Sequence, residues 1–248
     1  MEILSDLNDR DKIRYDRQMR IKGFGEKGQK KLKSTSVLVA GAGGLGSNAS
    51  VYLAMAGVGN LKIVDNDVVE LSNLNRQILY REGDIGRNKA KVASNNLKRL
   101  NRDVSVESFN CEINEKSVEE IVGGCDLIVD CLDNYETRYI LNEVSVKQET
   151  PLFHAAVRGL DGQTTTIIPG ETPCLKCIIP SPPAEEKIPV LGATPGLLAC
   201  IQAQELIKYV VGAKVSLKNK LLIVSRGAEF EALEIKKNPS CEVCSSKK

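Results

Sequence analysis

The sequence is poor in several features that would point to particular classes of protein. Its 248 residues include one histidine, His154, so histidine acid–base catalysis would depend on a single residue with apolar neighbours, which we expect to be structural. No apolar run approaches the roughly 20 residues that cross a bilayer. The stretch from Met1 to Arg20 is polar and charged, unlike a signal peptide. We therefore expect a cytoplasmic protein with no membrane partner.

The chain also lacks an excess of either charge. Its formal net charge is +2 and its basic residues are spread along the sequence, so no nucleic acid partner is expected. With 42% hydrophobic and 27% charged residues, it can bury an ordinary core, and we expect one domain over 1–248. This domain would comprise an N-terminal helical arm at 1–34, a nucleotide-binding half at 36–150 and a mixed-sheet half at 151–248.

Strand-like and helical patterns alternate through the first half of the chain. The strand-like runs lie at 36–41, 60–65, 104–109 and 125–130, and a helical stretch follows each of them. This order predicts an α/β fold with a parallel, doubly wound, Rossmann-like sheet. Residues 9–32 predict two N-terminal helices separated at 23–28, and residues 45–56 predict a helix that ends at a glycine.

The pattern changes after Pro151. Two strand-like runs flank "RGLDGQ", which predicts an antiparallel hairpin that turns near Asp161 and Gly162. The prolines of "IPSPPAEEKIP" predict an extended crossover loop at 178–193. A helix at 195–211 and strands at 220–225 and 229–235 would complete a mixed, partly antiparallel second half of the sheet.

The run "GAGGLGS" follows an apolar strand-like run and opens a predicted helix. Gly41, Gly43 and Gly46 match the spacing Gly-x-Gly-x-x-Gly, which in this context predicts a phosphate-binding turn that also includes Gly44. The alternative is that a tight strand-to-helix connection needs glycine for packing alone. The glycines by themselves do not distinguish a redox dinucleotide from ATP.

Charged residues near the predicted sheet edge favour ATP. Asp65 ends the second strand-like run, where a carboxylate can bind ribose hydroxyls of NAD or ATP, although a capping role is the alternative. Arg76 and Lys89 follow nearby, and Asp133 comes after the fourth run. A triphosphate under attack needs cations aimed at the leaving pyrophosphate, and a carboxylate suits Mg²⁺. Each residue alone is more often a solvated surface charge, but together they indicate a triphosphate site.

Four of the eight cysteines form two Cys-x-x-Cys pairs, Cys174 with Cys177 and Cys241 with Cys244. This spacing predicts a structural zinc site that holds the C-terminal segment against the domain. A redox pair is the alternative. It is disfavoured because there are two pairs and because neither is expected at the start of a helix after a strand.

Several motifs together resemble the MoeB/ThiF family, relatives of the ubiquitin-activating enzymes. They are "RYDRQMRIKGFGEKGQKKLKSTSVLVAGAGGLGS", "DNDVVELSNLNRQ", "GRNKA", "DCLDNYETR", "CLKC" and "CEVC", and they cover the chain from about Arg14 to Cys244. The resemblance implies ATP-dependent adenylation of the C-terminal glycine carboxylate of a ubiquitin-fold sulfur-carrier or modifier protein ending in Gly-Gly. Molybdopterin or thiamine synthesis, tRNA thiolation and protein modification are the implied settings.

The resemblance also implies roles for individual residues. Carried over by position, the implied nucleotide contacts are Gly41, Gly43, Gly44, Gly46, Asp65, Asp67, Asn73, Arg76, Lys89, Asp133 and Asn134. Arg76, Lys89 and Asp133 would also be catalytic, with Asp133 linked to magnesium. Arg17 matches a catalytic arginine that reaches across a two-fold interface into the neighbouring ATP site, which implies a homodimer. Without the resemblance, Arg17 would be interpreted as an exposed arginine on an amphipathic helix.

The chain departs from the family in its crossover loop. Many members carry a cysteine there that accepts a thioester or persulfide-derived bond, whereas here the corresponding position lies near Glu185. We therefore expect no thioester relay, and sulfur could come from a separate persulfide donor. Adenylation is unaffected, since it needs positioning and charge stabilisation rather than an enzyme nucleophile. Of the other thiols, we expect Cys125, Cys131 and Cys200 to be buried, and we leave Cys111 open.

Three alternatives to carrier adenylation remain open. The same chemistry could act on another carboxylate, such as a peptide terminus or a modified tRNA base. The chain could be a nicotinamide-dependent oxidoreductase, or a scaffold that keeps the fold and the zinc without turnover.

Overall fold

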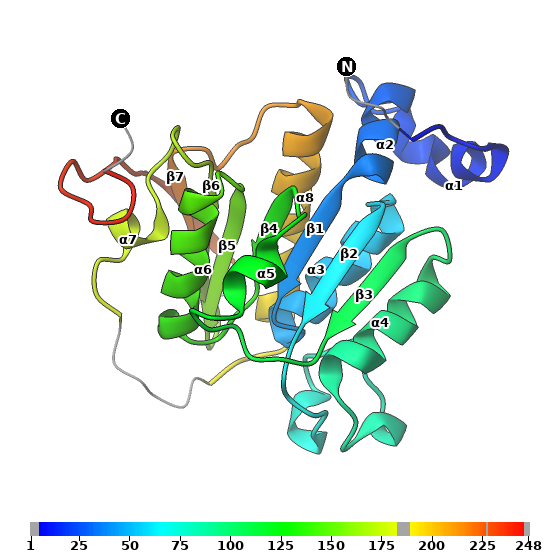
Figure 1. The fold of residues 1–248 in the computed structure, drawn as a ribbon, viewed down its shortest axis with the longest axis horizontal. Helices are drawn as coiled ribbons and strands as arrows, with labels where there is room; N and C mark the ends of the chain where they lie inside the picture. The colour runs from blue at the N-terminus through cyan, green and yellow to red at the C-terminus, as the bar shows by residue number, and fades with distance from the viewer. Residues whose placement is uncertain (1–4, 183–188, 227, 246–248) are drawn as a thin grey trace.

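The computed structural model describes residues 5–182, 189–226 and 228–245. In this part of the chain, eight strands form one sheet in the order β3-β2-β1-β4-β5-β6-β7-β8 (Figure 1). The strands are β1 (Ser36–Ala40), β2 (Asn60–Val64), β3 (Ser105–Phe109), β4 (Leu127–Asp130), β5 (Leu152–Arg158), β6 (Asp161–Ile167), β7 (Lys220–Ser225) and β8 (Glu229–Glu234). The pairs from β3 to β5 are parallel and those from β5 to β8 are antiparallel.

Helices cover both faces of this sheet. They are α1 (Asp9–Met19), α2 (Gly25–Ser34), α3 (Gly44–Ala56), α4 (Lys89–Leu100), α5 (Val118–Val122), α6 (Tyr135–Lys147), α7 (Leu175–Ile178) and α8 (Ala193–Val211), with short 3₁₀ turns η1 (Leu71–Asn73) and η2 (Glu82–Asp84). Figure 1 shows α5 and α6 in front of the sheet and α3 and α8 behind it. Among the described helices, none combines the length and apolar character needed to cross a membrane.

Strand β1 lies between two apolar layers. Val37 and Val39 belong to the core on the α3 and α8 face, whereas Leu38 and Ala40 belong to the core on the α5 and α6 face. All four are fully buried, as expected for a parallel strand that is covered on both sides. This explains why "VLVA" at 37–40 is a continuous apolar run.

The predicted fold class is confirmed. The parallel strands lie where the apolar runs predicted them, although β4 begins two residues later than expected, at Leu127. The helix after the glycine turn ends at Gly57, which adopts a left-handed conformation with φ 85°. Helix α8 begins two residues earlier than predicted, at Ala193. Pro195 is tolerated there because backbone N–H groups in the first turn of a helix need no partner within the helix.

The predicted position of the hairpin turn is wrong by two residues. Arg158 pairs with Asp161, so Gly159 and Leu160 form the loop, and the predicted turn residues Asp161 and Gly162 belong to β6. Gly159 has a φ of 64°. A two-residue hairpin loop favours glycine at its first position, and this preference outweighed the Asp-Gly signal.

The break between the N-terminal helices also differs from the prediction. It covers residues 20–24, and α2 already begins at Gly25. Positive φ values occur at Gly23 and Gly25, whereas Gly28 is helical. A Cβ on Gly28 would lie 3.2 Å from Val211 Cγ1 of α8, so this glycine allows the two helices to pack closely.

The winding of the sheet reverses between β1 and β4, and the edge at the carboxyl ends of these strands is here named the crevice. After β1 the chain continues to β2 on one side, and β4 lies on the other side of β1. In open α/β sheets, ligands bind at the carboxyl ends of the strands where the winding direction reverses. The glycine turn follows β1 at this point, and residues 131–134 follow β4 there.

We predict that Gly46→Ala destabilises the protein far more than Gly196→Ala. A Cβ at Gly46 would lie 1.8 Å from Gly41 O, which forces α3 away from β1, and such overpacking costs at least about 2 kcal/mol. The nearest atom to a Cβ on Gly196, in α8 opposite α3, is Asn48 Oδ1 at 3.6 Å. Urea unfolding of both variants measures the difference, and equal losses would contradict the packing argument.

Candidate active site

The glycine turn is held between the ends of β2 and β4. The backbone N–H of Gly41 donates to Val64 O at 2.9 Å, and Gly41 has a φ of 91°. A Cβ on this residue would lie 2.7 Å from Cys131 O. Only glycine suits both the backbone conformation and the space, so the turn brings the start of α3 directly against the loop after β4.

The beginning of α3 is suited to an anion. Gly43 caps this helix without a side-chain hydrogen bond, and the first turn contains no acidic residue. The backbone N–H groups at the start of a helix carry partial positive charge and lack partners within the helix. A phosphate group at this position would be stabilised by both effects.

Asp65 lies immediately after β2 and is fixed by the glycine turn. Its Oδ2 accepts a hydrogen bond from the backbone N–H of Ala42 at 2.8 Å, and its Oδ1 accepts one from Asp67 N at 2.9 Å. Burial raises the pKa of Asp65, although these hydrogen bonds and the charge of Lys89 oppose the increase. Each carboxylate oxygen retains a second lone pair that could accept a ribose hydroxyl.

Lys89 begins α4 and forms an ion pair with Asp67. The distance from Lys89 Nζ to Asp67 Oδ2 is 2.7 Å, and the lysine side chain is 7% exposed whereas that of Asp67 is 65% exposed. The two residues are also joined by a backbone hydrogen bond from Lys89 N to Asp67 O at 2.9 Å. One acceptor leaves two of the three ammonium protons of Lys89 for other ligands.

Asn73 and Arg76 lie on the loop between β2 and α4. Asn73 is buried, and its Oδ1 accepts from Glu70 N at 3.0 Å, so its side chain shapes the loop. Arg76 is partly exposed and donates to Ser72 O at 2.8 Å. Its Cδ lies 3.5 Å from the position of a Cβ on Gly44, so the arginine side chain lies across the start of α3.

Asp133 and Asn134 follow β4 on the other side of the glycine turn. Both are exposed. Asn134 caps α6 through a hydrogen bond from Thr137 N to its Oδ1 at 2.9 Å, and its Nδ2 donates to Asp133 Oδ1 at 3.5 Å. An exposed carboxylate two residues beyond Cys131, which lies close to Gly41, is the donor type that a hard divalent cation prefers.

The structure therefore brings all but one of the predicted nucleotide and catalytic residues to the crevice. Arg17 is the exception. It is exposed on α1, and its neighbour Gln18 donates to Ala56 O at the far end of α3 from the glycine turn. Figure 1 shows α1 beside the opposite edge of the sheet. The 13-residue helix α3 is about 20 Å long, so Arg17 does not reach the crevice of its own chain.

The sequence analysis missed Tyr80 and Gln77. Tyr80 is buried, and its hydroxyl donates to Ala42 O at 2.8 Å and contacts Lys89 O at 3.3 Å, which joins the glycine turn to α4. Burial raises the pKa of Tyr80, so its hydroxyl stays protonated. Gln77 Nε2 lies 3.7 Å from the position of a Cβ on Gly43. Gln77 directly follows Arg76 in "NLNRQ". Its position beside a predicted phosphate contact could have identified it as a site residue from the sequence.

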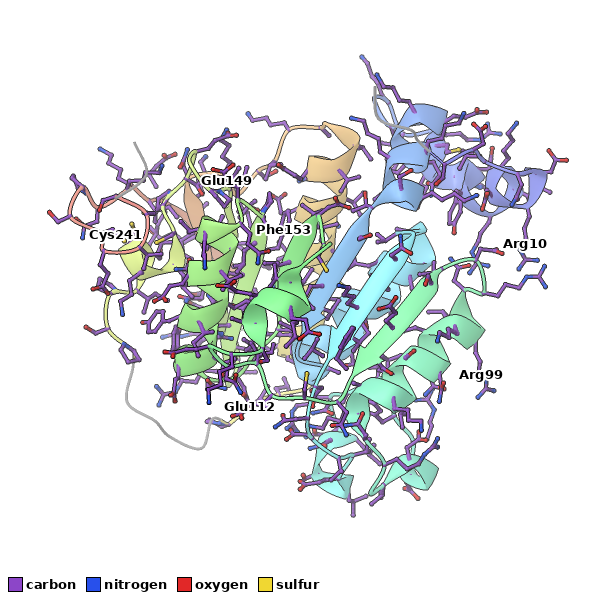
Figure 2. All side chains as sticks on the ribbon, in the orientation of Figure 1. Arg10, Arg99, Glu112, Glu149, Phe153 and Cys241 are labelled. Atoms are coloured by element: carbon purple, nitrogen blue, oxygen red, sulfur yellow. The ribbon has the colours of Figure 1, made fainter. Side chains whose placement is uncertain are left out.

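The four paired cysteines form one cluster at the other end of the sheet. Cys174 Sγ lies 3.6 Å from Cys241 Sγ, and Cys177 Sγ lies 3.4 Å from Cys244 Sγ. All four sulfur atoms lie within 4.8 Å of one another. Tetrahedral zinc with bonds of about 2.3 Å would hold sulfurs about 3.8 Å apart, so the cluster is compatible with zinc. Figure 2 shows Cys241 in the C-terminal loop beside α7.

The thiols of the cluster differ in how readily they ionise, since burial raises the pKa of Cys174 and of Cys244 but the pKa of Cys241 is lowered. Burial opposes its ionisation, but hydrogen bonds from the backbone of Cys244 and Val243 and from the thiols of Cys177 and Cys174 lower its pKa to about 7. A thiolate is the form that binds zinc. One argument against a redox pair was wrong, because Cys174 is the N-cap of α7. This helix has only four residues, and the two cysteine pairs form one cluster. A shared four-cysteine cluster favours a metal site over a redox pair.

The expectations for the other thiols are confirmed in part. Cys131 is buried, but Cys125 and Cys200 are partly exposed, as is Cys111. The prediction of a buried Cys200 is wrong because this residue lies on α8 next to the exposed Tyr52 of α3. Glu185, where the family's loop cysteine would align, lies outside the described residues.

The fold is an α/β sheet with helices on both faces, and the helix start at its switch point is suited to a phosphate group. The ThiF family model matches residues 15–243. The chain belongs to the ThiF family, and it is an adenylyltransferase.

Known proteins resemble this chain over most of its length. SAMP-activating enzyme E1 of Haloferax volcanii is 41% identical over 238 residues, which cover 93% of this chain and 88% of that protein. Adenylyltransferase and sulfurtransferase MOCS3 of Drosophila persimilis is 40% identical, and the match covers 97% of this chain and 55% of MOCS3. The crystal structure of E. coli MccB with ATP superposes with a TM-score of 0.84 at 26% identity, covering 93% of this chain and 73% of MccB.

We predict that the cysteine cluster holds about one zinc ion per chain. Cys241→Ser should abolish zinc binding and lower the melting temperature by about 5–10 °C, because the metal would join the C-terminal segment to α7. Elemental analysis and thermal unfolding measure both effects. Cys200→Ser, outside the cluster, is the matched control and should retain the metal. Zinc content that survives Cys241→Ser would contradict the assignment.

Proposed function

We propose that this protein uses ATP to adenylate the C-terminal glycine carboxylate of a ubiquitin-fold sulfur-carrier or modifier protein. The observation that carries the proposal is the placement of Arg76, Lys89 and Asp133 around a helix start free of acidic residues. The name of the Haloferax relative, an activating enzyme of the E1 type, supports a protein substrate. The MccB structure with ATP supports the nucleotide.

The arrangement suggests how ATP lies in the crevice. Its phosphates would contact the N–H groups at the start of α3, and its ribose hydroxyls would bind Asp65. Asp67 holds the Lys89 ammonium in place at 2.7 Å, so the lysine need not be reorganised when the nucleotide binds. Asn73 would act by holding the loop that carries Arg76.

The reaction needs no nucleophile from the enzyme. An oxygen of the carrier's terminal carboxylate attacks the α-phosphorus, the bond from that phosphorus to the bridging oxygen of the β-phosphate breaks, and pyrophosphate leaves. Arg76 and Lys89 would stabilise the negative charge that develops on the leaving group. The start of α3 would orient the α-phosphate for in-line attack.

Asp133, with Asn134 beside it, fits a magnesium site. Its carboxylate is exposed, and it lies two residues after Cys131, whose backbone is close to the glycine turn. When bound, Mg²⁺ neutralises charge on the phosphates. Asp133 would fix the position of the metal-bound phosphates relative to α3.

The further fate of the acyl-adenylate follows from the loop composition. We propose that the outer sulfur of a persulfide on a separate donor attacks the acyl carbon of the adenylate, which breaks the bond from that carbon to the phosphate oxygen and releases AMP. A separate donor is needed because glutamate stands here where many family members carry the loop cysteine. The name of MOCS3 combines adenylyl transfer with sulfur transfer, which supports a sulfur-carrier pathway. The nicotinamide alternative does not fit an adenylyltransferase family.

We also propose a homodimer in which Arg17 enters the crevice of the other subunit. The crevice of the same subunit lies at the far end of α3 from Arg17, so Arg17 cannot contact a nucleotide bound there. The exposed apolar residues Ile13 and Ile21 accompany it on and beside α1, and they are 80% and 60% exposed. An isologous contact would bury such residues in both subunits.

The adenylation proposal predicts ATP–pyrophosphate exchange that depends on a carrier ending in Gly-Gly. Lys89→Ala and Asp133→Asn should each lower the exchange rate by about 10²–10³-fold, because each removes charge stabilisation at the phosphates. Isotope exchange with radioactive pyrophosphate measures the rate.

Two neighbouring residues provide matched controls for these variants. Lys91→Ala lies on the exposed side of α4, and Glu136→Gln lies in the first turn of α6, so both should leave exchange unchanged. Release of ADP in place of pyrophosphate would overturn the proposal, as would the absence of exchange with every carrier tested. If only a free peptide or a modified tRNA base supports exchange, the substrate is a carboxylate other than that of a carrier protein.

The dimer proposal predicts that two inactive variants complement each other. Arg17→Ala and Lys89→Ala chains, mixed and allowed to exchange subunits, should regain about a quarter of wild-type exchange activity. Half of the dimers would then be mixed, and one of their two sites would carry neither substitution. Arg20→Ala, on the same exposed surface, is the control for Arg17 and should remain active without mixing. No recovery in the mixture would exclude a shared site.

A further inference from the structure

A buried charged cluster lies beneath the loop that carries Asp133. It consists of Asp130 at the end of β4, His154 on β5 and Arg138 on α6, which are 1%, 0% and 3% exposed. Asp130 and His154 are register partners in adjacent parallel strands, so their side chains lie on the same face of the sheet. This is the face where the α6 core is otherwise apolar, so these polar groups require compensation.

Asp130 is the centre of the cluster. Its Oδ2 lies 2.6 Å from His154 Nδ1 and 3.5 Å from Arg138 Nε, and its Oδ1 accepts a hydrogen bond from the backbone N–H of Leu132 at 3.1 Å. Burial opposes its ionisation, but Arg138, His154 and Leu132 N together lower the pKa of Asp130. Asp130 is therefore a carboxylate that binds β5, α6 and the loop after its own strand.

Arg138 binds the same loop from the other side. Its Nη2 donates to Leu132 O and to Ala155 O, the latter at 2.9 Å. The backbone of Leu132 is thus held at its N–H by Asp130 and at its C=O by Arg138. Leu132 is the residue immediately before Asp133, so the cluster determines the direction in which the chain leaves β4.

His154 completes the cluster as a neutral donor. Burial and the charge of Arg138 lower the pKa of His154, and Asp130 only partly opposes this. The neutral ring with its proton on Nδ1 donates to Asp130, and its Nε2 has no hydrogen-bond partner among the described residues. One anion, one cation and one neutral ring leave the buried cluster without net charge.

Stability alone is a weak reason for such a cluster. Replacing a buried ion pair with apolar residues of similar size is often neutral or stabilising, so apolar residues would serve the core equally well. What apolar residues could not do is hold both backbone groups of Leu132 at the edge of the crevice. The location of the cluster therefore indicates a role in the loop.

We propose that Arg138 and His154 are positioning residues that act through Asp130 and the backbone of Leu132 to aim the Asp133 carboxylate at the nucleotide-bound metal. The inference rests on the proposed role of Asp133 in the adenylation site. A displacement of about 1 Å at a group that positions a reacting phosphate can lower a rate by about 10²-fold. Holding the Leu132 backbone at two points limits such displacement.

The test compares His154→Leu with His154→Asn by measuring ATP affinity calorimetrically with Mg²⁺ and with EDTA, without any carrier protein. Leucine removes the donor to Asp130, whereas the asparagine amide nitrogen can replace Nδ1. We expect His154→Leu to reduce the Mg²⁺-dependent gain in ATP affinity by about fivefold or more, with metal-free binding unchanged. His154→Asn should restore most of the gain.

A double-mutant cycle with Asp133→Asn separates positioning from general stability. If His154 acts through Asp133, His154→Leu should have no further effect on the Mg²⁺-dependent gain once Asp133 is replaced. Additive effects would overturn the proposal, as would ATP binding that does not depend on Mg²⁺ in the unmodified protein. Tyr139→Phe, which removes a hydrogen bond from the same helix to Ile179 O, is the control and should leave the gain intact.

A second substitution covers the case in which His154→Leu does not fold. Arg138→Lys keeps the charge but cannot bind Asp130, Leu132 O and Ala155 O together, so it should show the same loss of the Mg²⁺-dependent gain. The binding assay contains no carrier, so it does not depend on the proposed substrate. If the His154→Leu effect disappears once Asp133 is replaced but no carrier is adenylated, only the proposed function is rejected. If the two effects are additive but a carrier is adenylated normally, only the positioning role is rejected.

Discussion

The close approach of α3 to β1 is the constraint on which the rest of the structure depends. The position of a Cβ on Gly46 lies 1.8 Å from Gly41 O, and that of a Cβ on Gly41 lies 2.7 Å from Cys131 O. Without side chains at these two points, the start of α3 meets the ends of β1 and β4. This contact places free backbone N–H groups at the point where the sheet reverses its winding, which is where a doubly wound sheet binds its ligand.

The charged residues of the crevice are prearranged by partners from other elements. Asp67 holds Lys89, Ala42 N holds Asp65, and the cluster beneath Leu132 holds the loop before Asp133. The contacts of Lys89 and of Asp65 join segments that are separate in sequence, as does the contact of Asp130 with His154 within the cluster. A site that stabilises developing charge works best when its dipoles and charges need no reorganisation during the reaction, and these pairings provide such a site. The cysteine cluster lies apart from it and joins the C-terminal segment to α7.

The parts of the fold that sequence predicted well share a local cause. Parallel strands buried on both faces appear as short apolar runs, and helix ends appear as glycines, so β1, β2, β3 and α3 were found nearly within their observed bounds. The errors arose where two local signals competed or where burial depended on a distant element. In the hairpin, the turn forms at Gly159 rather than at Asp161 and Gly162. Cys200 is partly exposed because of its position on α8 relative to α3.

The sequence by itself determined the parallel doubly wound fold, the glycine turn, the acidic and basic residues near it and the two cysteine pairs, because each follows from residue type and short spacing. Only the tertiary structure showed that Asp67 holds Lys89, that Tyr80 joins the turn to α4 and that Arg17 lies far from its own crevice. It also brought Asp130, Arg138 and His154 together. Such contacts depend on strand register and helix packing. Both bring together residues that are far apart in the sequence, so local residue patterns do not predict them.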